Sequence, residues 1–372
     1  MTQLPRVAHI IAPAPVGGAE QVVLDLTESL TREGVEAHLI PLLDLDADQH
    51  PFLDAVPPSV PTHPVRVPPR AYRQERARVK ALIHELGIEV VHTHGYRADV
   101  IGGSAARAER AATVSTAHGF TGGGVRNRLY EWMQRRALRR CDGVVAVSEP
   151  LRDILVGKGV PDSRVRVIPN ARGTPRGVLD RAEARRSLGL SESDFEVGWV
   201  GRMSREKGPD VMLDALVWAV ESGRAPSLAA TFVGDGRERA GLEERSRTGV
   251  LEGRVRWLGR VPNASRYLLA FDVLVLSSRS EGTPIVALEA MALGVPLVAT
   301  HVGGVPHLVG PGSGLLVQPE NPQKLGDAIV AVLEDREGAS QRAEVARHRV
   351  QERHSTESWA RDHTKLYLQV AP

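Results

Sequence analysis

The sequence predicts an α/β protein built from two doubly wound parallel-sheet domains, and three observations support this fold class. Short runs rich in valine, isoleucine and alanine recur along the 372-residue chain, and a helical stretch follows each run. The runs are nearly continuous in apolar residues, as expected for parallel strands that helices cover on both faces. The alternation stops near the middle of the chain and then restarts, and a chain of this length usually needs more than one hydrophobic core.

The predicted strands form two series. The first comprises RVAHIIA from Arg6, EVVHTH from Glu89, ATVSTAH from Ala112, GVVAVS from Gly143 and RVRVIPN from Arg164. The second comprises EVGWVG from Glu196, AATFVG from Ala229, RVRWLG from Arg254, DVLVLS from Asp272, VPLVAT from Val295 and SGLLV from Ser313. Between them, residues 171–194 are rich in glycine, proline and charged residues around the helical segment LDRAEARRSLGL, and we interpret this stretch as a linker.

Two Rossmann-like domains are therefore expected, the first over 1–172 and the second over 173–354. The last segment, STESWARDHTKLYLQ, starts with the capping residue Ser355 and carries Trp359, Leu366 and Tyr367, which predicts a terminal helix that packs on one of the domains. In open parallel sheets, ligands bind beyond the carboxyl ends of the strands. We therefore expect a ligand site that draws residues from both halves of the chain.

The composition argues against several classes of protein. Lysine and arginine total 47 against 45 acidic residues, and a net charge of +2 does not suggest a nucleic-acid-binding protein. Cys141 is the only cysteine, so an internal disulfide is excluded and the reducing cytoplasm is the expected compartment. No run reaches the roughly 18 uninterrupted apolar residues of a membrane-spanning helix, so any membrane contact would be peripheral.

A loop and helix start that could hold a phosphate follow the strand DVLVLSS. Thr283 gives a helix start signal with Pro284 in the first turn, and Val286 stands where a glutamate or glutamine would complete a capping box. The amides of Ile285 and Val286 are then available to an anion at the positive end of the helix dipole. An ordinary strand–turn–helix connection has the same pattern, so this signal alone leaves both interpretations open.

Two glutamates flank this helix start in the segment EGTPIVALE. Glu281 lies in the loop beside Gly282, whereas Glu289 lies in an otherwise apolar run. A buried carboxylate without a partner is costly, so Glu289 should meet a hydrogen-bond donor. That donor could be a ribose hydroxyl, an arginine or a backbone amide.

Cations and glycines follow other predicted strands. Arg202 and Lys207, in VGRMSREKG, suit a diphosphate because they would neutralise the charge that a departing nucleoside diphosphate gains, although either residue alone is more simply a solvated loop cation. Gly17 and Gly18 let a helix start approach a ligand closely. They do not form the G-x-G-x-x-G fingerprint of dinucleotide-binding folds.

Histidines end two of the predicted strands. His118 precedes Gly119 at the expected ligand-binding edge, where it could hydrogen-bond a sugar or polarise a leaving group, although a single histidine is more often structural. His92 and His94 could suggest a metal site, but we find no third ligand at a supporting spacing. We therefore expect no metal there.

Taken together, these motifs resemble the retaining glycosyltransferases of family 4, which have the GT-B fold. The resemblance spans roughly Arg6 to Val317, and its most specific part is E-x7-E together with R-x4-K. It rests on Gly17-Gly18, His118-Gly119, VAVSE from Val145, VIPN from Val167, VGRMSREKG from Val200, VGDG from Val233 and SEGTPIVALEAMALGVPLVAT from Ser280. One departure is Ala171, followed by Arg172, where many members of the family have glycine after the asparagine.

The resemblance implies a nucleotide-sugar donor that the second domain mainly holds. The residues that it assigns to catalysis are His118, Arg202, Lys207 and Glu281. Those that it assigns to donor binding are Gly17, Gly18, Val261, Gly282, Thr283, Pro284, Ile285, Val286 and Glu289. Within these sets, the two cations would bind the diphosphate, Glu281 the sugar hydroxyls and Glu289 the ribose. Val261 would lie beside the nucleobase, and a terminal helix over 355–372 would cross back onto the first domain.

The family resemblance also implies a mechanism and partners. The sugar would move from a UDP- or GDP-sugar to the hydroxyl of a sugar, lipid-linked or other acceptor, with retention of the anomeric configuration, in the synthesis of cell-envelope glycans, polysaccharides or glycolipids. The β-phosphate would help to deprotonate the acceptor, and electrostatic stabilisation of the leaving diphosphate would need no metal and no other cofactor. No convincing D-x-D motif follows a strand, which agrees with this expectation.

A basic segment, GVRNRLYEWMQRRALRRC, predicts an amphipathic helix that carries Arg126, Arg128, Arg135, Arg136, Arg139 and Arg140. Such helices attract anionic lipid surfaces or anionic acceptors, so this region could contact a membrane peripherally. A half-buried helix with a solvated face has the same pattern.

Three other functions remain open from the sequence. A nucleotide-sugar epimerase of the same architecture would form product from the donor alone. A non-catalytic sugar-nucleotide-binding protein would bind the nucleotide without turnover. A nicotinamide-dependent oxidoreductase is disfavoured by the missing glycine fingerprint.

Overall fold

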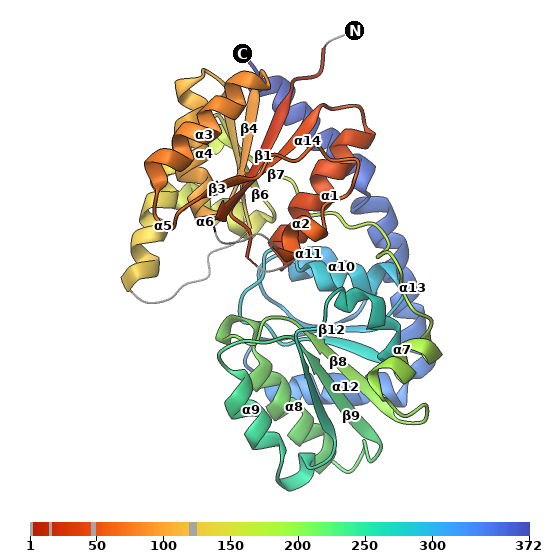
Figure 1. The fold of residues 1–372 in the computed structure, drawn as a ribbon. Coiled ribbons are helices and arrows are strands. Elements are labelled where there is room, and N and C mark those ends of the chain that lie inside the picture. The colour runs from red at the N-terminus through yellow and green to blue at the C-terminus, as the bar shows by residue number, and fades with distance from the viewer. Residues whose placement is uncertain (1–2, 15–16, 46–49, 119–124) are drawn as a thin grey trace. The chain divides into compact units, whose positions relative to one another are not determined.

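The computed structural model describes residues 3–14, 17–45, 50–118 and 125–372, with the backbone alone for 125–131. The chain forms two compact units, one comprising Met1–Ala171 with Ser355–Pro372 and the other Arg172–His354. Each unit is a parallel sheet flanked by helices, as Figure 1 shows for each of them. This architecture confirms the predicted α/β fold class.

The sheet of the first unit has seven parallel strands in the order β3-β2-β1-β4-β5-β6-β7. The strands are β1 (Val7–Ile11), β2 (Ala37–Asp44), β3 (Val65–Val67), β4 (Val90–His94), β5 (Ala112–Ala117), β6 (Gly143–Ala146) and β7 (Val165–Val167). The helices are α1 (Gly18–Arg32), α2 (Pro51–Asp54), α3 (Tyr72–Glu85), α4 (Tyr96–Ala108), α5 (Val125–Leu138), α6 (Glu149–Gly157), the 3-10 helix η1 (Asp162–Arg164) and α14 (Thr356–Val370).

The two faces of this sheet differ in chemistry. On one face, Ile10 and Val91 pack against Ile83 of α3 and Ile101 of α4 in an apolar core. The other face carries buried histidines of β1 and β4, and α14 covers them through Tyr367. Figure 1 shows α3 and α4 on one side of this sheet and α1 and α14 on the other. The first unit therefore has an apolar core under α3 and α4 and a polar core under α14.

The sheet of the second unit has six parallel strands in the order β10-β9-β8-β11-β12-β13. The strands are β8 (Phe195–Val200), β9 (Leu228–Val233), β10 (Val255–Gly259), β11 (Val273–Leu276), β12 (Leu297–Thr300) and β13 (Leu315–Val317). The helices are α7 (Arg181–Leu188), η2 (Arg205–Lys207), α8 (Pro209–Glu221), α9 (Arg239–Ser246), η3 (Gly249–Leu251), η4 (Ala264–Ala270), α10 (Ile285–Ala292), α11 (Val305–Val309), α12 (Pro322–Glu334) and α13 (Arg336–Arg353).

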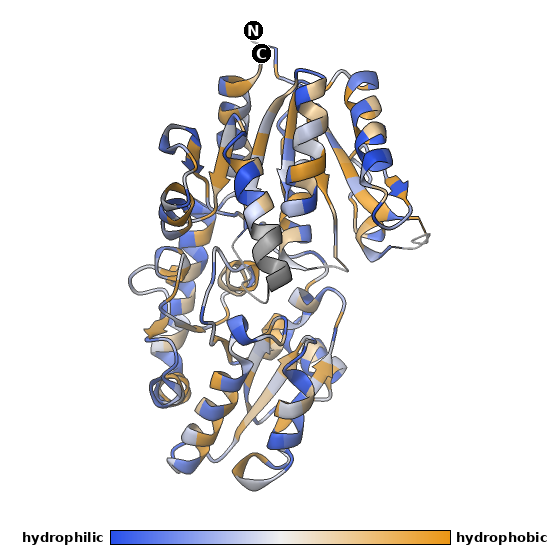
Figure 2. Ribbon diagram, turned by 90° about the vertical axis from the view of Figure 1, so that its left-hand side faces the viewer, coloured by the Kyte–Doolittle hydropathy of each residue, from blue (hydrophilic) through white to orange (hydrophobic). Residues whose placement is uncertain are grey.

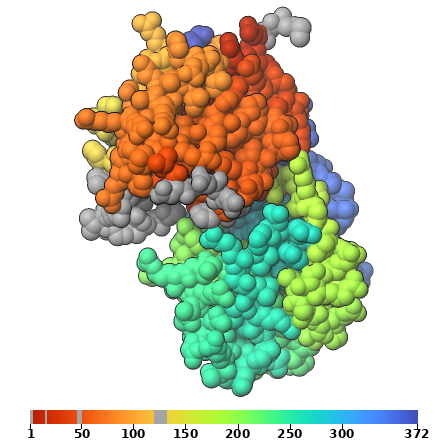
Figure 3. All heavy atoms as spheres, in the orientation of Figure 1, coloured from red at the N-terminus to blue at the C-terminus, as the bar shows by residue number. Residues whose placement is uncertain are grey.

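The strands of both sheets are mainly hydrophobic, as the orange colouring in Figure 2 shows, which explains why apolar runs predicted them. The space-filling view shows that the visible surface of the second unit comes mainly from the segment coloured green to teal, with the lime-green part of the chain at its edge (Figure 3). Two strands, β2 and β3, were not predicted.

The interpretation of 171–194 as a linker needs correction, because α7 is built into the second unit. Arg185 of α7 is only 1% exposed and donates to the carbonyl of Ala270 at 3.0 Å and to the carboxylate of Asp272 at 2.7 Å. Asp272 precedes β11, so this buried ion pair fixes α7 against the sheet. No helix among the described residues is long and apolar enough to cross a membrane.

Candidate active site

Lys207 and Glu281 form an ion pair beyond the carboxyl ends of two central strands of the second sheet. Strands β8 and β11 are neighbours in this sheet, and the two residues lie in the loops that follow them. The ammonium of Lys207 donates to both carboxylate oxygens of Glu281, at 2.8 and 2.7 Å, and Ser278 Oγ donates to Oε1 at 2.7 Å. The side chain of Glu281 is only 7% exposed. The structure thus places together two of the residues that the sequence predicted for catalysis.

Close backbone contacts hold the two loops of this pair in place. Gly208, directly after Lys207, has a φ of +62°, and a Cβ atom there would lie 2.1 Å from the carbonyl oxygen of Ser277. Gly303 has a φ of +51°, and a Cβ atom there would lie 1.8 Å from the carbonyl oxygen of Glu281. Only glycine fits such positions, so both loops are defined by packing of the backbone.

The helix start that was expected at Thr283 lies one residue later. Pro284 is the N-cap of α10, with an extended backbone at φ −69° and ψ 118°, and no side chain caps the helix. Pro284 therefore has extended geometry just before the helix. With Thr283 as the cap, Pro284 would instead have been the first helical residue. Among the described residues, nothing accepts a hydrogen bond from the amides of Ile285 and Val286. Gly282 and buried Thr283 connect this helix start to Glu281.

Glu289 meets an arginine that the sequence analysis did not identify as a site residue. Nε and Nη2 of Arg172 lie 3.1 and 2.8 Å from Oε1 of Glu289, and both side chains are 11% exposed. The donor that Glu289 needs is thus supplied at least in part by protein. The only signal in the sequence was that Arg172 follows Ala171, where the family pattern has glycine.

Arg202 and Val261 take part in neither the Lys207–Glu281 ion pair nor the Arg172–Glu289 ion pair. The side chain of Arg202 is 60% exposed and contacts Glu206 at 2.9 Å, so the structure does not join it to Lys207 and Glu281. Val261 follows β10 and is half-buried against the apolar core. A further arginine, Arg279, forms a bidentate ion pair with Asp210 at 2.8 and 2.7 Å and so ties the loop after β11 to α8.

The predicted residues of the first unit lie at the carboxyl edge of its sheet. Gly17 is the N-cap of α1, and Gly18 is the first residue of this helix. A carboxylate of the protein occupies the region near this helix start, since Glu20 Oε1 accepts from the amide of Ala14 at 3.0 Å. His118 follows β5, and its Nε2 lies 3.3 Å from Nδ1 of His94. Gly119 lies outside the described residues.

The structure supplies the third histidine that the spacing of His92 and His94 did not reveal. Strands β1 and β4 pair with His9 opposite His92, and the ligand atoms of the three rings lie within 4.8 Å of one another. Burial lowers the pKa of His9 to about 3 and holds the pKa values of His92 and His94 well below their usual range. Neutral imidazoles can bind a transition metal. The expectation that His92 and His94 have no third ligand nearby was therefore wrong, because His9 lies beside them.

The first unit has a cavity of about 320 Å³ at the same edge as His118. Its lining residues are Ala12, Pro13, Ala14, Leu42, Leu43, Asp44, His50, His94, Gly95, Tyr96 and Arg97. Arg97 is held by buried Glu75 at 2.7 Å and by Asp44 at 3.6 Å, which leaves a polar wall without excess positive charge. A cavity with this lining could accommodate a hydroxyl-bearing ligand.

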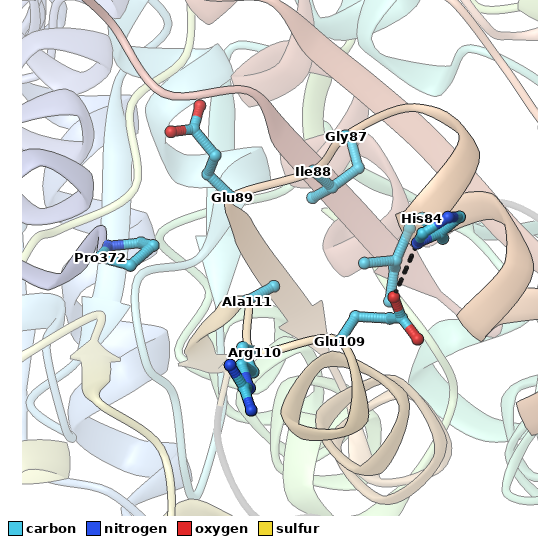
Figure 4. A pocket seen from close by; sticks show the side chains of 9 residues that line it. His84, Gly87, Ile88, Glu89, Glu109, Arg110, Ala111 and Pro372 are labelled. Atoms are coloured by element: carbon cyan, nitrogen blue, oxygen red, sulfur yellow. Dashed lines mark hydrogen bonds and ion pairs between the residues drawn. The ribbon is translucent and has the colours of Figure 1, made fainter.

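A second hollow in the first unit lies at the opposite edge of the sheet (Figure 4). Its volume is about 260 Å³, and Glu89 and Ala111, which line it, directly precede β4 and β5. In Figure 4, His84 and Glu109 face each other across a hydrogen bond of 3.0 Å. Ligands of parallel sheets bind at the carboxyl edge, so we do not assign this hollow to the active site.

Two arginines of the basic segment 124–141, which contains α5, have interaction partners. Arg139 donates to the carbonyl oxygen of Lys158 at 3.1 Å, and Arg135 also has an interaction partner. The side chains of Arg126 and Arg128 lie outside the described residues. Neither the structure nor the comparisons below support membrane contact through this helix.

Comparisons with known proteins cover most of the chain. Residues 16–173 match the model of Glycosyltransferase Family 4, and residues 180–349 match the model of Glycosyl transferases group 1. A UDP-Gal:alpha-D-GlcNAc-diphosphoundecaprenol alpha-1,3-galactosyltransferase of Escherichia coli is 26% identical over 89% of this chain and 88% of its own length. A putative teichuronic acid biosynthesis glycosyltransferase, TuaC of Bacillus subtilis, is 35% identical over 52% of this chain, and the match spans about half, 48%, of that relative.

The fold resembles that of a solved structure over nearly the whole chain. The crystal structure of Anabaena HepE in complex with UDP-glucose has a TM-score of 0.83 at 22% sequence identity, covering 98% of this chain and 100% of HepE. At this level of identity the likeness establishes the shared fold.

Proposed function

Since the chain belongs to the group 1 glycosyltransferases of family 4, with the GT-B fold, we propose that it transfers a sugar from a nucleoside diphosphate donor to a hydroxyl acceptor with retention of configuration. The observation that carries this proposal is the pair of Lys207 and Glu281 beside the uncapped start of α10. A cation, a carboxylate and open amides meet there at the edge of a parallel sheet, where such sheets bind ligands.

The chemistry of this pair fits a departing diphosphate. An ammonium group has three N–H donors, and Glu281 accepts from Lys207 with its two oxygens, so a donor remains for a phosphate oxygen. The amides of Ile285 and Val286 would bind the distal phosphate at the positive end of α10. Both interactions strengthen as the leaving group gains charge, which lowers the barrier to transfer.

The carboxylates of Glu281 and Glu289 would bind the two sugars of the donor. Glu281, fixed by Lys207 and Ser278, would accept from hydroxyls of the transferred sugar. Glu289, oriented by Arg172, would accept from the ribose hydroxyls, and Val261 would lie beside the base. Arg202 would reach the diphosphate by leaving its exposed contact with Glu206, and such surface ion pairs contribute little stability.

The acceptor would bind at the carboxyl edge of the first sheet, in the cavity beside His94 and near His118. The β-phosphate would take the proton of the attacking hydroxyl, and no metal would be required. The named activities of the relatives favour a UDP-sugar and a role in cell-envelope glycan synthesis.

A thermal-shift panel of UDP-, GDP- and ADP-sugars tests donor binding, because a ligand that binds only the native state raises its stability. The stabilising donor is then incubated with candidate hydroxyl acceptors, and the anomeric configuration of the product is read by proton NMR. We expect transfer with retention in the wild type and strongly reduced transfer in Glu281→Gln. Conversion of the donor without acceptor would instead indicate an epimerase, and binding without turnover a non-catalytic protein.

A further inference from the structure

Three histidines of the first unit form a hydrogen-bonded chain that ends at His118. Nδ1 of His9 lies 3.1 Å from Nε2 of His94, and Nδ1 of His94 lies 3.3 Å from Nε2 of His118. The rings come from three adjacent strands, since His9 lies on β1, His94 on β4 and His118 directly after β5. We propose that this chain fixes the tautomer of His118, with the proton on Nδ1 and Nε2 acting as the acceptor. The catalytic consequence rests on the proposed function.

The chain allows two arrangements of protons. All three rings are neutral near pH 7, because burial lowers the pKa of His9 to about 3, that of His94 well below its usual range and that of His118 to about 4. A neutral imidazole carries one N–H and one lone pair. The two N···N bonds therefore require either that every ring is protonated at Nδ1 or that every ring is protonated at Nε2.

The far end of the chain decides between these arrangements. Nε2 of His9 is buried and has no hydrogen-bond partner among the described residues. If every ring carried its proton on Nε2, this atom would be a buried N–H without an acceptor. With every proton on Nδ1, the same atom is instead a buried lone pair without a donor. Buried acceptors without a full set of partners are found somewhat more often in native proteins than buried N–H groups without a partner. The arrangement with every proton on Nδ1 is therefore favoured.

This arrangement assigns a role to His94 and His9 and restricts the role of His118. The lone pair of His118 Nε2 is occupied by the N–H of His94, so His118 cannot accept the proton of an attacking hydroxyl through that atom. His118 keeps a donor at Nδ1, which suits a hydrogen bond to an oxygen of donor or acceptor. This agrees with a mechanism in which the β-phosphate takes the proton. His94 is then a positioning residue that acts through His118.

A metal at His9, His92 and His94 is the competing explanation of the same cluster. Both nitrogens of His92 are already engaged, since Nε2 lies 2.7 Å from Thr116 Oγ1 and Nδ1 lies 2.7 Å from the hydroxyl of Tyr367. A three-histidine zinc site needs one free lone pair from each ring. Ligation by His92 would break one of these bonds, so the observed contacts favour the hydrogen-bonded chain.

Long-range ¹H–¹⁵N NMR of the full chain with ¹⁵N-labelled histidine tests the proposal directly, with signals assigned through single variants. We expect His9, His94 and His118 all to show the Nδ1–H pattern at pH 7.5 without donor. An Nε2–H pattern at His118 would overturn the proposal. So would joint shifts of His9, His92 and His94 on adding one equivalent of Zn²⁺ or on chelation. This readout does not depend on transfer, so it can succeed or fail separately from the proposed function.

Two variants of His94 then separate positioning from structure. His94→Leu removes the donor to His118, and loss of one hydrogen bond should lower kcat about tenfold with KM for the donor nearly unchanged. The Nε2–H form of His118 should appear at the same time. His94→Asn keeps an N–H near the position of Nδ1 and should restore the Nδ1–H form and most of kcat. Equal losses of kcat in both variants, with an unchanged His118 spectrum, would show a purely structural role.

Discussion

Acidification should destabilise the first unit of the chain much more than the second. Burial lowers the pKa of His9 to about 3 and the pKa of His363 to about 4, from the usual value of 6.5. Below pH 6.5 the unfolded state therefore binds more protons than the folded state. The free energy of unfolding should fall as the pH drops from 6.5 to about 3, with the contribution of His363 complete near pH 4, and this loss should level off below the folded-state values.

His9 and His363 alone should reduce the free energy of unfolding substantially at acidic pH. At pH 5 each should reduce the free energy of unfolding by about 2 kcal/mol, since each pH unit below the unfolded-state pKa corresponds to about 1.4 kcal/mol. Both side chains are at most 1% exposed, so little of the effect is lost to solvent screening. Their sum, about 4 kcal/mol, compares with a total stability of about 5–15 kcal/mol for a typical domain. Burial also lowers the pKa values of His92, His94 and His118, so this sum is a lower bound for the histidines. Burial raises the pKa of Asp99, which opposes the loss, so the test compares variants.

Hydrogen exchange with mass spectrometry at pH 7 and pH 5, corrected for intrinsic rates, measures the opening free energy of β1 and β4 against that of β8 and β11. We expect β1 and β4 to lose at least about 4 kcal/mol in the wild type, and about 2 kcal/mol less than the wild type in His363→Gln. The second unit buries His354 alone among its histidines, so β8 and β11 should change less. His84, with a side chain 79% exposed, provides the control His84→Gln, which should behave as the wild type. Equal protection of β1 and β4 at both pH values would refute the reasoning.

Three further predictions concern the second unit. Glu281→Gln should lower kcat about 100-fold while the dissociation constant of the nucleotide, from calorimetry, changes only a few-fold, and an unchanged kcat would contradict the assigned role. Gly303→Ala should destabilise the protein by about 2 kcal/mol or more in urea unfolding, because its Cβ would lie 1.8 Å from the carbonyl oxygen of Glu281. Gly294→Ala is the matched control, since its φ is +70° but nothing lies within 4 Å, so it should cost about 1 kcal/mol. Arg172→Met should weaken nucleotide affinity about tenfold by removing the guanidinium that orients Glu289, and an affinity equal to the wild type would argue against this role.

The fold could be predicted where strands are continuous apolar runs, and it could not where the sequence interrupts them. Strand β2 contains Pro41, which lacks an N–H for the ladder and therefore argues against a strand interior. In the structure Pro41 lies opposite Ile11, the last residue of β1, so the missing donor falls at the end of that pairing. Strand β3 has only three residues and gives no periodic signal.

Side chains at the carboxyl ends of strands could be predicted from the sequence, but their partners could not. Lys207 and Glu281 meet because β8 and β11 are adjacent, and strand order is not encoded in spacing along the chain. His9 joins His92 through the register of β1 and β4, which is equally invisible in one sequence. Arg172 was noted only as the residue after Ala171, because only the folded chain shows that it reaches Glu289.

The return of the chain to its first unit sets an order for biosynthesis. Residues 355–372 complete that unit, and Tyr367 of α14 supplies the hydroxyl that binds His92. On the ribosome, residues 172–354 are a contiguous segment and can fold as soon as they emerge. The first unit is synthesised earlier, but its polar core cannot form completely until α14 has been synthesised. A nascent chain halted before Trp359 should therefore carry an incomplete amino-terminal unit beside a finished second one.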